Sequence, residues 1–382
     1  MQVLIIGGGG REHAIAWKLA QSPRLTRLYC APGNPGIASV AECVDVPLRP
    51  GFAEVVDWCR AHAIDLVVVG PERPLADGIV DALQAAGVRA FGPTREGAQL
   101  ESSKRFAKEL MQEAGIPTGR ARWFRDYDEA VAYLKELEPP YVIKASGLAE
   151  GKGVTVARDL EQAVGALGEM MRERRFGESG DEVLIEEFLM GEEASLLAFT
   201  DGRVLRPMDS AQDHKPVFDG DEGPNTGGMG GYSPAPVVDG AMYERCVREV
   251  LEPCLEALKR RGIDYRGIIY AGLMITADGP SVVEFNCRFG DPETQALLPR
   301  LDGDLLEIML ACAEGRLAEV EFGWRDDAAI CVVAASGGYP GDYEKGKVIR
   351  GLDTLPANGD AIVFHAGTAR NEKGEIVTSG GR

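Results

Sequence analysis

Short apolar runs alternate with amphipathic segments along the first hundred residues. Four of these runs have the length and composition of buried strands: Val3–Ile6, Arg27–Cys30, Leu66–Val69 and Val88–Phe91. Between them, Glu12–Gln21 and Phe52–Ala61 space their apolar residues as helices do. Repeated strand–helix steps with Gly and Pro at the strand ends predict an open parallel sheet wound with helices, whose ligand lies at the carboxyl ends of the strands.

The rest of the chain predicts smaller α/β and α+β units. Helices are expected at Ser102–Ala114, from about Leu160, and at Gly303–Ala313. The expected strands are Tyr141–Lys144, Val154–Ala157, Val183–Phe188, Glu193–Thr200, Gly267–Ile275 and Val282–Arg288. The polar, glycine-rich stretch Asp209–Tyr232 is expected to be a loop, and the segment from Ala328 is expected to contain strands and turns.

Charge and composition exclude several kinds of partner. The 382 residues carry a formal net charge of −19, and an acidic surface repels nucleic acid and anionic membranes. An anionic ligand therefore needs a local basic pocket, helped by metal ions. The N-terminus is typical of a strand rather than a signal peptide, and no apolar run approaches the ~20 residues that span a bilayer. Eight scattered cysteines without a CxxC pair predict reduced, buried thiols in a cytoplasmic protein.

The first glycine loop, Gly7–His13 (GGGGREH), joins a predicted strand to a predicted helix, where backbone amides can bind phosphate. A dinucleotide-binding fingerprint is not favoured, because its last position requires Gly or Ala and is Glu12 or His13 here. The loop suits a single sugar phosphate, with Arg11 and the amides facing the phosphate and Glu12 accepting from hydroxyls or an amine. The alternative is a structural turn capped by Glu12, although four consecutive glycines cost backbone entropy.

A second glycine loop, Ser146–Gly153, joins two predicted strands and is flanked by Lys144 and Lys152. It resembles a P-loop superficially. The spacing, however, is one residue short, Gly153 replaces Ser or Thr, and a strand follows instead of a helix. The pattern therefore indicates a glycine flap whose backbone amides cover phosphates and close on binding.

The predicted strand Val282–Arg288 carries three polar side chains at alternate positions. Because alternate side chains of a strand share a face, Glu284, Asn286 and Arg288 are expected to point the same way. Carboxylate and amide oxygens suit Mg²⁺, and a guanidinium suits phosphate or carboxylate. The strand is interpreted as a metal site beside an anion clamp. The alternative is a solvated strand face with incidental charges.

Together these motifs resemble the ATP-grasp superfamily, in which ATP lies between two α+β lobes, and within it the phosphoribosylamine–glycine ligases. Seven strings carry the resemblance: GGGGREHA (7–14), APGNPG (31–36), VVGPE (68–72), KASGLAEGKGV (144–154), LIEEFLMGEEAS (184–195), DHKPVFDGDEGPNTGGMG (213–230) and EFNCRFGDPETQ (284–295). They occur in the family's order along the whole chain. The resemblance implies that glycine is joined to 5-phosphoribosylamine, with ATP, through glycyl phosphate, in purine biosynthesis.

The resemblance also implies site residues. ATP contacts are implied for Lys104, Lys144, Ser146, Gly147, Gly151, Gly153, Glu186, Phe188, Glu193 and Lys215. Mg²⁺ or Mn²⁺ ligation is implied for Glu284 and Asn286. Phosphoribosyl contacts are implied for Gly9, Gly10, Arg11, Glu12, His13, Asn34, Pro35 and Gly36, and a glycine and transfer site for Gly228 and Met229. Catalytic roles are implied for Lys144, Asp213, Lys215, Arg288 and Asp291.

Two features depart from the resemblance. Many ATP-grasp enzymes place another acidic metal ligand on the preceding strand, where Ala271–Met274 offers none, so a metal site that depends more on the nucleotide is expected. The family normally continues past Arg382, so an incomplete last domain is expected. The predicted domains are 1–103 for the phosphoribosyl substrate, 104–192 for the small ATP-grasp lobe, 193–327 for the large lobe and 328–382 at the C-terminus. A monomer or weak homodimer is expected.

Three other functions stay open. Another ATP-grasp carboxylate–amine ligase, such as a carboxylating or formylating purine enzyme, differs in the carboxylate that triggers ADP release. A Rossmann oxidoreductase predicts nicotinamide binding. A nucleotide sensor predicts ATP binding without turnover. For the ligase, no side-chain nucleophile is needed, because positioning and charge neutralisation carry the reaction.

Overall fold

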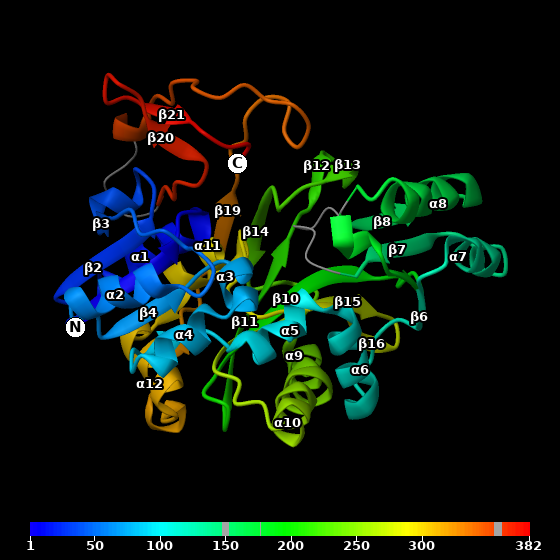
Figure 1. Cartoon of the computed structure of the whole chain (residues 1–382), viewed down its shortest axis with the longest axis horizontal. Coiled ribbons are helices and arrows are strands. Elements are labelled where there is room, and N and C mark those ends of the chain that lie inside the picture. The colour runs from blue at the N-terminus through cyan, green and yellow to red at the C-terminus, as the bar shows by residue number, and fades with distance from the viewer. Residues whose placement is uncertain (147–152, 176, 355–360) are drawn as a thin grey trace.

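The first domain is built on a five-stranded parallel sheet in a computed structural model that describes residues 1–146, 153–175, 177–354 and 361–382 (Figure 1). The strand order is β3-β2-β1-β4-β5, with β1 (Gln2–Gly7), β2 (Arg27–Pro32), β3 (Glu42–Cys43), β4 (Leu66–Val69) and β5 (Ala90–Phe91). Its helices are α1 (Gly10–Leu19), α2 (Ala53–Ala61), α3 (Glu72–Asp77) and α4 (Ile79–Ala85). The predicted open parallel sheet is confirmed, although β3 was not predicted and β5 begins two residues late.

The central strands of this sheet are apolar throughout because both faces are covered. On β1, Leu4 and Ile6 pack into one buried cluster, while Val3 and Ile5 pack into a second cluster. Alternate residues of a strand point to opposite faces, so each face needs its own apolar set. The carboxyl end of β1 is thereby held rigidly where the first glycine loop begins.

Helices α5 (Arg95–Ser102) and α6 (Lys104–Ala114) lead to the small lobe, at the right of Figure 1. Its antiparallel sheet has the order β6-β9-β7-β8, with β6 (Ala121–Phe124), β7 (Tyr141–Ala145), β8 (Val154–Ala157) and β9 (Val183–Glu186). Helices α7 (Tyr127–Leu134) and α8 (Leu160–Leu167) belong to the same lobe and share a separate core with the sheet. The predicted strands and the helix from Leu160 are confirmed, except that β9 ends at Glu186 rather than Phe188.

The large lobe contains a six-stranded sheet in the order β16-β15-β10-β11-β14-β19. Its strands are β10 (Glu192–Thr200), β11 (Leu205–Asp213), β14 (Gly230–Ser233), β15 (Gly267–Thr276), β16 (Gly279–Asn286) and β19 (Ala329–Val332). Its helices are α9 (Gly240–Cys246), α10 (Glu252–Arg260), α11 (Glu293–Leu297) and α12 (Leu305–Glu314). Four further short strands are β17 (Leu301–Asp302), β18 (Gly323–Trp324), β20 (Thr368–Arg370) and β21 (Ile376–Thr378).

The prediction of a loop over Asp209–Tyr232 is wrong. Strand β11 continues to Asp213, β12 (Pro216–Phe218) pairs with β13 (Glu222–Asn225), and β14 begins at Gly230. Backbone hydrogen bonds form these ladders, and the residues lack the apolar alternation by which a strand is recognised in a sequence.

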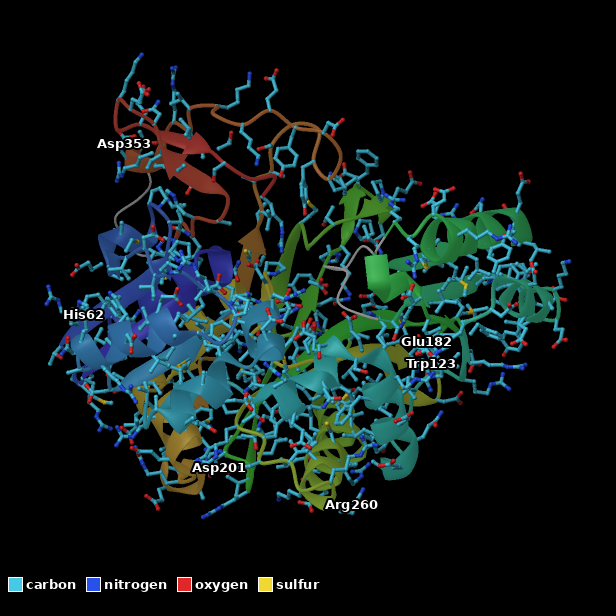
Figure 2. All side chains as sticks on the ribbon, viewed as in Figure 1. His62, Trp123, Glu182, Asp201, Arg260 and Asp353 are labelled. Carbon is cyan, nitrogen blue, oxygen red and sulfur yellow. The ribbon has the colours of Figure 1, made fainter. Side chains whose placement is uncertain are left out.

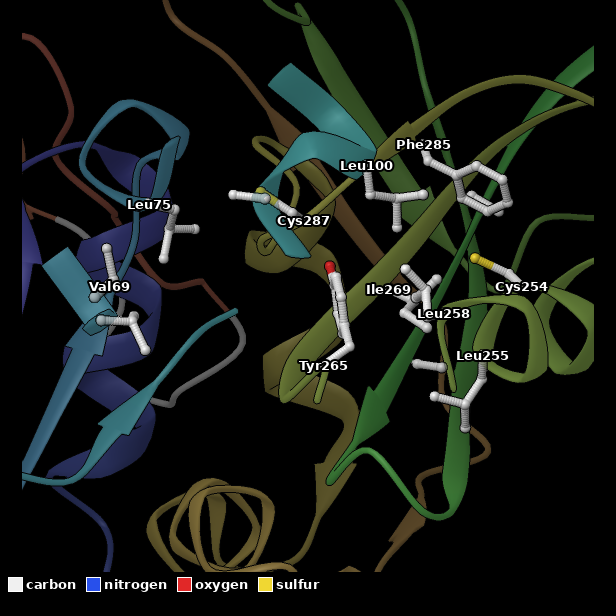
Figure 3. Packing of buried hydrophobic residues seen from close by; sticks show 14 of the residues in the cluster. Val69, Leu75, Leu100, Cys254, Leu255, Leu258, Tyr265, Ile269, Phe285 and Cys287 are labelled. Carbon is white, nitrogen blue, oxygen red and sulfur yellow. The ribbon is translucent and has the colours of Figure 1, made fainter. Parts of the chain in front are cut away.

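One buried cluster continues from the first domain into the large lobe. It includes Val69 and Leu75 of the first domain together with Ile269 and Phe285 of the large sheet (Figure 3). A shared core fixes the first glycine loop relative to β16, because close-packed interiors resist sliding.

Charged side chains lie around the periphery. His62, Arg260 and Asp353 are exposed, as Figure 2 shows. Within the described ranges, no helix combines the length and apolarity required to cross a bilayer.

Candidate functional site

Glu284 on β16 is surrounded by basic side chains from both lobes. Lys144 of β7 donates from Nζ to the carbonyl oxygen of Val283 at 3.1 Å, which brings the small lobe onto the metal-binding strand proposed from the sequence. Desolvation by the surrounding protein would raise the pKa of Glu284, but the charges of Lys215, Lys144, Lys104 and Arg288 hold this pKa below its usual value. The local basic pocket expected in an acidic protein is therefore present here.

The donor set at Glu284 suits a metal ion that brings further ligands with it. Asn286 is 7% exposed, and its Oδ1 already accepts from Arg288 Nη2 at 3.0 Å. In the cross-strand register, the residue opposite Glu284 is Gly272 of β15, which supplies no oxygen ligand. Among the described residues, no three His, Cys, Asp or Glu side chains cluster as a metal site. Glu284 and Asn286 would offer two protein oxygens to a hard divalent cation, and such a cation would draw further oxygen ligands from its substrate or from water.

Arg288 lies beyond the end of β16, so the predicted strand to Arg288 is two residues too long. Its guanidinium donates to Glu101 Oε1 at 2.9 Å and to Glu72 Oε2 at 3.3 Å. The strand ends because Glu101 Oε2 accepts the Cys287 N–H at 2.9 Å in place of a ladder partner. Two carboxylates from the first domain thus orient the proposed anion clamp. Sequence reasoning missed both, since their distance along the chain hides the contact.

Lys144 is buried and shares a carboxylate with a second lysine. Lys144 Nζ lies 2.5 Å from Glu186 Oε2, and Lys108 pairs with Glu186 Oε1. Lys108 was also missed, although its position four residues after Lys104 on α6 places both on one helix face. The pKa of Lys104 is lowered, chiefly by desolvation.

Asp213 ends β11, and Lys215 lies two residues beyond it. Lys215 Nζ donates to Glu193 Oε2 at 2.6 Å. Burial raises the pKa of Asp213 to about 7, with the charge of Lys215 opposing the shift and that of Glu293 adding to it. No described residue forms a hydrogen bond or ion pair with the Asp213 carboxylate. A desolvated carboxylate in this state favours a ligand that carries an ammonium group or another N–H donor.

The first glycine loop is closed on itself by Glu12. Glu12 Oε2 accepts from the Gly9 amide at 2.6 Å, and Glu12 Oε1 accepts from Arg11 Nε at 2.6 Å. Arg11 also donates from Nη1 to the Phe289 carbonyl at 3.1 Å and is only 8% exposed. Both side chains are therefore engaged with the protein, in the manner of the capped turn considered from the sequence. The free surface of the loop consists mainly of glycine backbone.

The loop after β2 packs between the first glycine loop and the C-terminal segment. Asn34 donates from Nδ2 to the carbonyls of Gly8 and His365, at 2.9 and 2.8 Å. A Cβ on Gly36 would lie 2.4 Å from His13 Cε1, so only glycine permits this approach. His365 donates its backbone N–H to His13 Nδ1 at 2.7 Å. Burial, and then His365, lowers the pKa of His13 to about 4.

The remaining predicted site residues lie near Glu284 or near the first glycine loop, or outside the described residues. Gly228 lies near Asp291 through Arg382, whose Nη1 is 3.1 Å from Gly228 O and 3.3 Å from Asp291 Oδ1. Three further predicted contacts, Ser146, Phe188 and Met229, are at least partly exposed. Gly153 O accepts from the Ala145 amide at 2.8 Å, whereas Gly147 and Gly151 lie outside the described residues. Pro35 belongs to the loop after β2.

The fold and site define a class. A small antiparallel lobe and a large sheet meet at buried lysines and a Glu-x-Asn strand, behind an open parallel N-terminal sheet, which is the arrangement of an ATP-grasp enzyme. Family models agree: the N domain of phosphoribosylglycinamide synthetase matches residues 1–101, its ATP-grasp domain matches 102–294 and its C domain matches 329–382. The chain belongs to this family of ATP-dependent ligases.

Individual relatives agree with the family assignment. Phosphoribosylamine–glycine ligases of Rhizobium meliloti and Caldanaerobacter subterraneus are 53% and 50% identical over the whole chain, which covers 89% and 90% of their lengths. The crystal structure of the Thermotoga maritima phosphoribosylamine–glycine ligase is 32% identical, with a TM-score of 0.85 over all of this chain and 90% of that one. A Campylobacter jejuni biotin carboxylase structure shares the fold at 16% identity, with a TM-score of 0.72 over 99% of this chain and 86% of that one.

Proposed function

We propose that the protein joins glycine to 5-phosphoribosylamine at the expense of ATP, giving glycinamide ribonucleotide, ADP and phosphate. The observation that carries the proposal is the basic ring around Glu284, to which the small lobe contributes Lys144 and the large lobe Lys215. A triphosphate and a carboxylate substrate that react with each other both need positive charge at the same site. The acidic protein provides this charge around Glu284. The relatives named for this reaction support the choice of substrates.

In the first step, the glycine carboxylate attacks the γ-phosphorus of ATP, the bond to the bridging oxygen breaks, and ADP leaves. The product is glycyl phosphate. We assign the γ-phosphate to Lys144 and Lys215, and the attacking carboxylate to Arg288. Glu72 and Glu101 hold the Arg288 guanidinium in place before substrate binds, so little reorganisation accompanies the reaction.

In the second step, the amine of phosphoribosylamine attacks the carbonyl carbon of glycyl phosphate, the bond to phosphate breaks, and the nitrogen loses a proton. We assign the glycine ammonium to the Asp213 carboxylate, which has neither a hydrogen bond nor an ion pair with any described residue, although the charge of Lys215 acts on it. We assign the phosphoribosyl group to the backbone of Gly9 and Gly10 and to the loop of Asn34. The glycine flap predicted over Ser146–Gly153, of which residues 147–152 lie outside the described residues, is proposed to exclude water from the acyl phosphate.

Glu284 and Asn286 are proposed to hold Mg²⁺ or Mn²⁺. When bound, the ion would neutralise charge on the phosphate oxygens. Its remaining ligands are assigned to the nucleotide because Gly272 stands opposite Glu284. Glu193 and the backbone around Phe188 are assigned to ribose and adenine.

Cellular location and assembly are also proposals. Eight free cysteines suit a reducing compartment, so we infer a cytoplasmic enzyme. A monomer or weak homodimer is proposed.

The decisive experiment measures ADP release with glycine and phosphoribosylamine omitted in turn. The proposal expects no sustained ADP release without glycine and a stoichiometric amide product with both substrates. Release triggered by bicarbonate or formate instead would favour a carboxylating or formylating relative. ATP binding without any turnover would favour a nucleotide sensor.

A further inference from the structure

Gln295 has a polar atom that the protein leaves without a partner. Gln295 lies on α11 and is 8% exposed. Its Nε2 donates to Asp291 Oδ1 at 2.9 Å, which fixes the orientation of the amide because a carboxylate requires a donor. Its Oε1 has no donor among the described residues. A buried acceptor without a donor lowers the stability of a fold, so its presence needs a reason.

Gln295 lies directly beneath the first glycine loop. A Cβ on Gly10 would come within 2.7 Å of Gln295 Nε2, so the loop passes over the amide without a side chain between them. Both residues, with Asp291 and Arg382, line a cavity of about 1170 Å³ between the first domain, the large lobe and the C-terminal segment. The unpartnered acceptor is therefore placed where the proposed phosphoribosyl loop meets the proposed transfer site.

The carboxylate bonded to Gln295 favours a donor over an anion at its own position. Asp291 Oδ2 accepts from the Arg11 amide at 3.2 Å, and Asp291 Oδ1 lies 3.3 Å from Arg382 Nη1. Arg300, Arg325 and Arg350 line the cavity as well and supply positive charge for an anionic group of the ligand away from Asp291. A ligand phosphate next to Asp291 would meet like charge, whereas an amine offers N–H donors to a carboxylate and an amide oxygen. The first glycine loop thus suits the amine end of the ligand at Asp291, with the phosphate farther away.

We propose that Gln295 Oε1 and the Asp291 carboxylate receive the two N–H groups of phosphoribosylamine, so that the nitrogen lone pair faces the acyl carbon. The inference rests on the proposed function. As the C–N bond forms and the bond to phosphate breaks, the proton leaving nitrogen passes to Asp291. Gln295 then acts in orientation and specificity: it favours an amine over a hydroxyl, which has only one hydrogen to donate.

Two half-reactions separate this role from the rest of the mechanism. Hydroxylamine attacks glycyl phosphate to give glycyl hydroxamate, which reports the first step without phosphoribosylamine. Amide formation with phosphoribosylamine reports the transfer. Gln295→Met keeps the length of the side chain and removes the acceptor. Gln84→Met, on the exposed face of α4, is the matched control.

For Gln295→Met we expect hydroxamate formation within about twofold of the parent protein, an unchanged KM for glycine, and a loss of about 100-fold in kcat/KM for phosphoribosylamine. The control should change neither. Unchanged transfer in a cooperatively melting Gln295→Met protein would overturn the proposal, and so would equal losses in both half-reactions. If the parent protein itself yields no hydroxamate, the proposed function is wrong.

If the Gln295→Met protein does not fold, Gln295→Glu tests whether transfer depends on the acceptor at position 295. The carboxylate introduced by Gln295→Glu keeps an acceptor oxygen, but it no longer donates a hydrogen bond to Asp291. The two carboxylates therefore repel each other unless one of them is protonated and they share that proton. Transfer by Gln295→Glu should therefore recover as pH falls, relative to the parent protein at the same pH. A transfer rate that falls with pH in parallel with the parent protein would contradict the assignment.

Discussion

Lys144 Nζ lies 2.5 Å from Glu186 Oε2, joining the neighbouring strands β7 and β9 near the carboxyl end of β7. Lys108 pairs with the other oxygen of the same carboxylate. Two buried lysines therefore share one negative charge, and the second negative charge that this arrangement favours is the one a nucleotide phosphate supplies. The two lysines are distinguished by their other contacts. Lys144 reaches Val283 on β16, whereas Lys108 donates to Thr118 and Gly119.

These different contacts predict that Lys144 acts mainly on ATP and Lys108 mainly on the stability of the fold. Lys144→Met should lower kcat/KM for ATP by about 10²–10³-fold, because a charge next to the phosphates is lost while Glu186 stays paired. Lys108→Met should leave kcat/KM for ATP within about fivefold and lower the stability by about 1–3 kcal/mol, because buried hydrogen bonds are lost. Steady-state kinetics and thermal unfolding of both variants provide the measurement, and the reverse pattern would exchange their roles.

Glu284→Gln tests the metal role at nearly constant shape. We expect turnover to fall by at least about 100-fold and the apparent Mg²⁺ requirement to rise, since one oxygen ligand loses its charge. Glu192→Gln is the matched control, because Glu192 is an exposed glutamate on β10. Near-normal turnover of Glu284→Gln at limiting Mg²⁺ would remove Glu284 from the metal site.

The same substitution also predicts a pH effect on stability. The lowered pKa of Glu284 means that its ionised form stabilises the fold above the unfolded pKa, and that this contribution is lost as pH falls through the folded pKa. The parent protein should therefore lose part of its advantage over Glu284→Gln in acid. Unfolding midpoints of the two proteins from pH 7 down to pH 4 measure the effect.

The pKa of Asp213 is shifted in the opposite direction to that of Glu284, so its effect on stability has the opposite dependence on pH. Its pKa is raised to about 7, so the fold favours the protonated acid, and stability is lost as pH rises from the unfolded pKa through about 7. Asp213→Asn should therefore be more stable than the parent at pH 8, by on the order of 1–3 kcal/mol, and similar at pH 4. If ionised Asp213 holds the glycine ammonium, the parent KM for glycine should rise as pH falls below about 7.

Kinetics of Asp213→Asn complete this test. The variant should show a KM for glycine raised by about 10-fold or more at pH 8, with little of the parent's dependence on pH below 7. The KM for ATP serves as the internal control. A variant that binds glycine normally, or keeps the parent's pH profile, would assign the glycine ammonium elsewhere.

The parts of the fold predicted correctly were those with local signals. Val3–Ile6 and Leu66–Val69 are apolar on both faces, so their strands stand out. Helix α6 ends at the predicted residue, Ala114, because Gly115 takes a left-handed conformation there. The β-ladders over Asp209–Tyr232 were not predicted, because backbone hydrogen bonds alone define them.

The site was predicted in its motifs rather than in its contacts. Glu284 and Lys144 belong to recognisable strings, and the structure brings them together at β16. Glu101 carries no signal in a single sequence, since its importance comes from Arg288, which lies far away along the chain. Gln295 belongs to the string 284–295 but was given no role, since its importance comes from a hydrogen-bond partner that is missing. Arg11, expected to face a phosphate, is instead engaged by Glu12 because the loop folds back on itself.

Asn34 provides a test of how the phosphoribosyl loop is held. Its Oδ1 accepts from the Gly36 and Ile37 amides, both at 2.9 Å, while its Nδ2 serves two carbonyls. Asn34→Ala should lower stability by about 2–4 kcal/mol through the lost bonds. Asn34→Asp should be at least as damaging at pH 8, because a buried carboxylate would face the oxygens of Gly8 and His365 without a donor.

The pH dependence separates the two Asn34 variants. Protonation of the carboxylate introduced by Asn34→Asp restores one O–H donor, so the Asn34→Asp deficit should shrink as pH falls from 8 to 5, whereas the Asn34→Ala deficit should stay constant. Asn225→Asp, at an exposed position of β13, controls for the added charge. Thermal unfolding midpoints at both pH values provide the readout, together with the KM for phosphoribosylamine, which should rise in both variants. An Asn34→Asp protein as stable as the parent at pH 8 would show that Nδ2 does not hold the loop to the C-terminal segment.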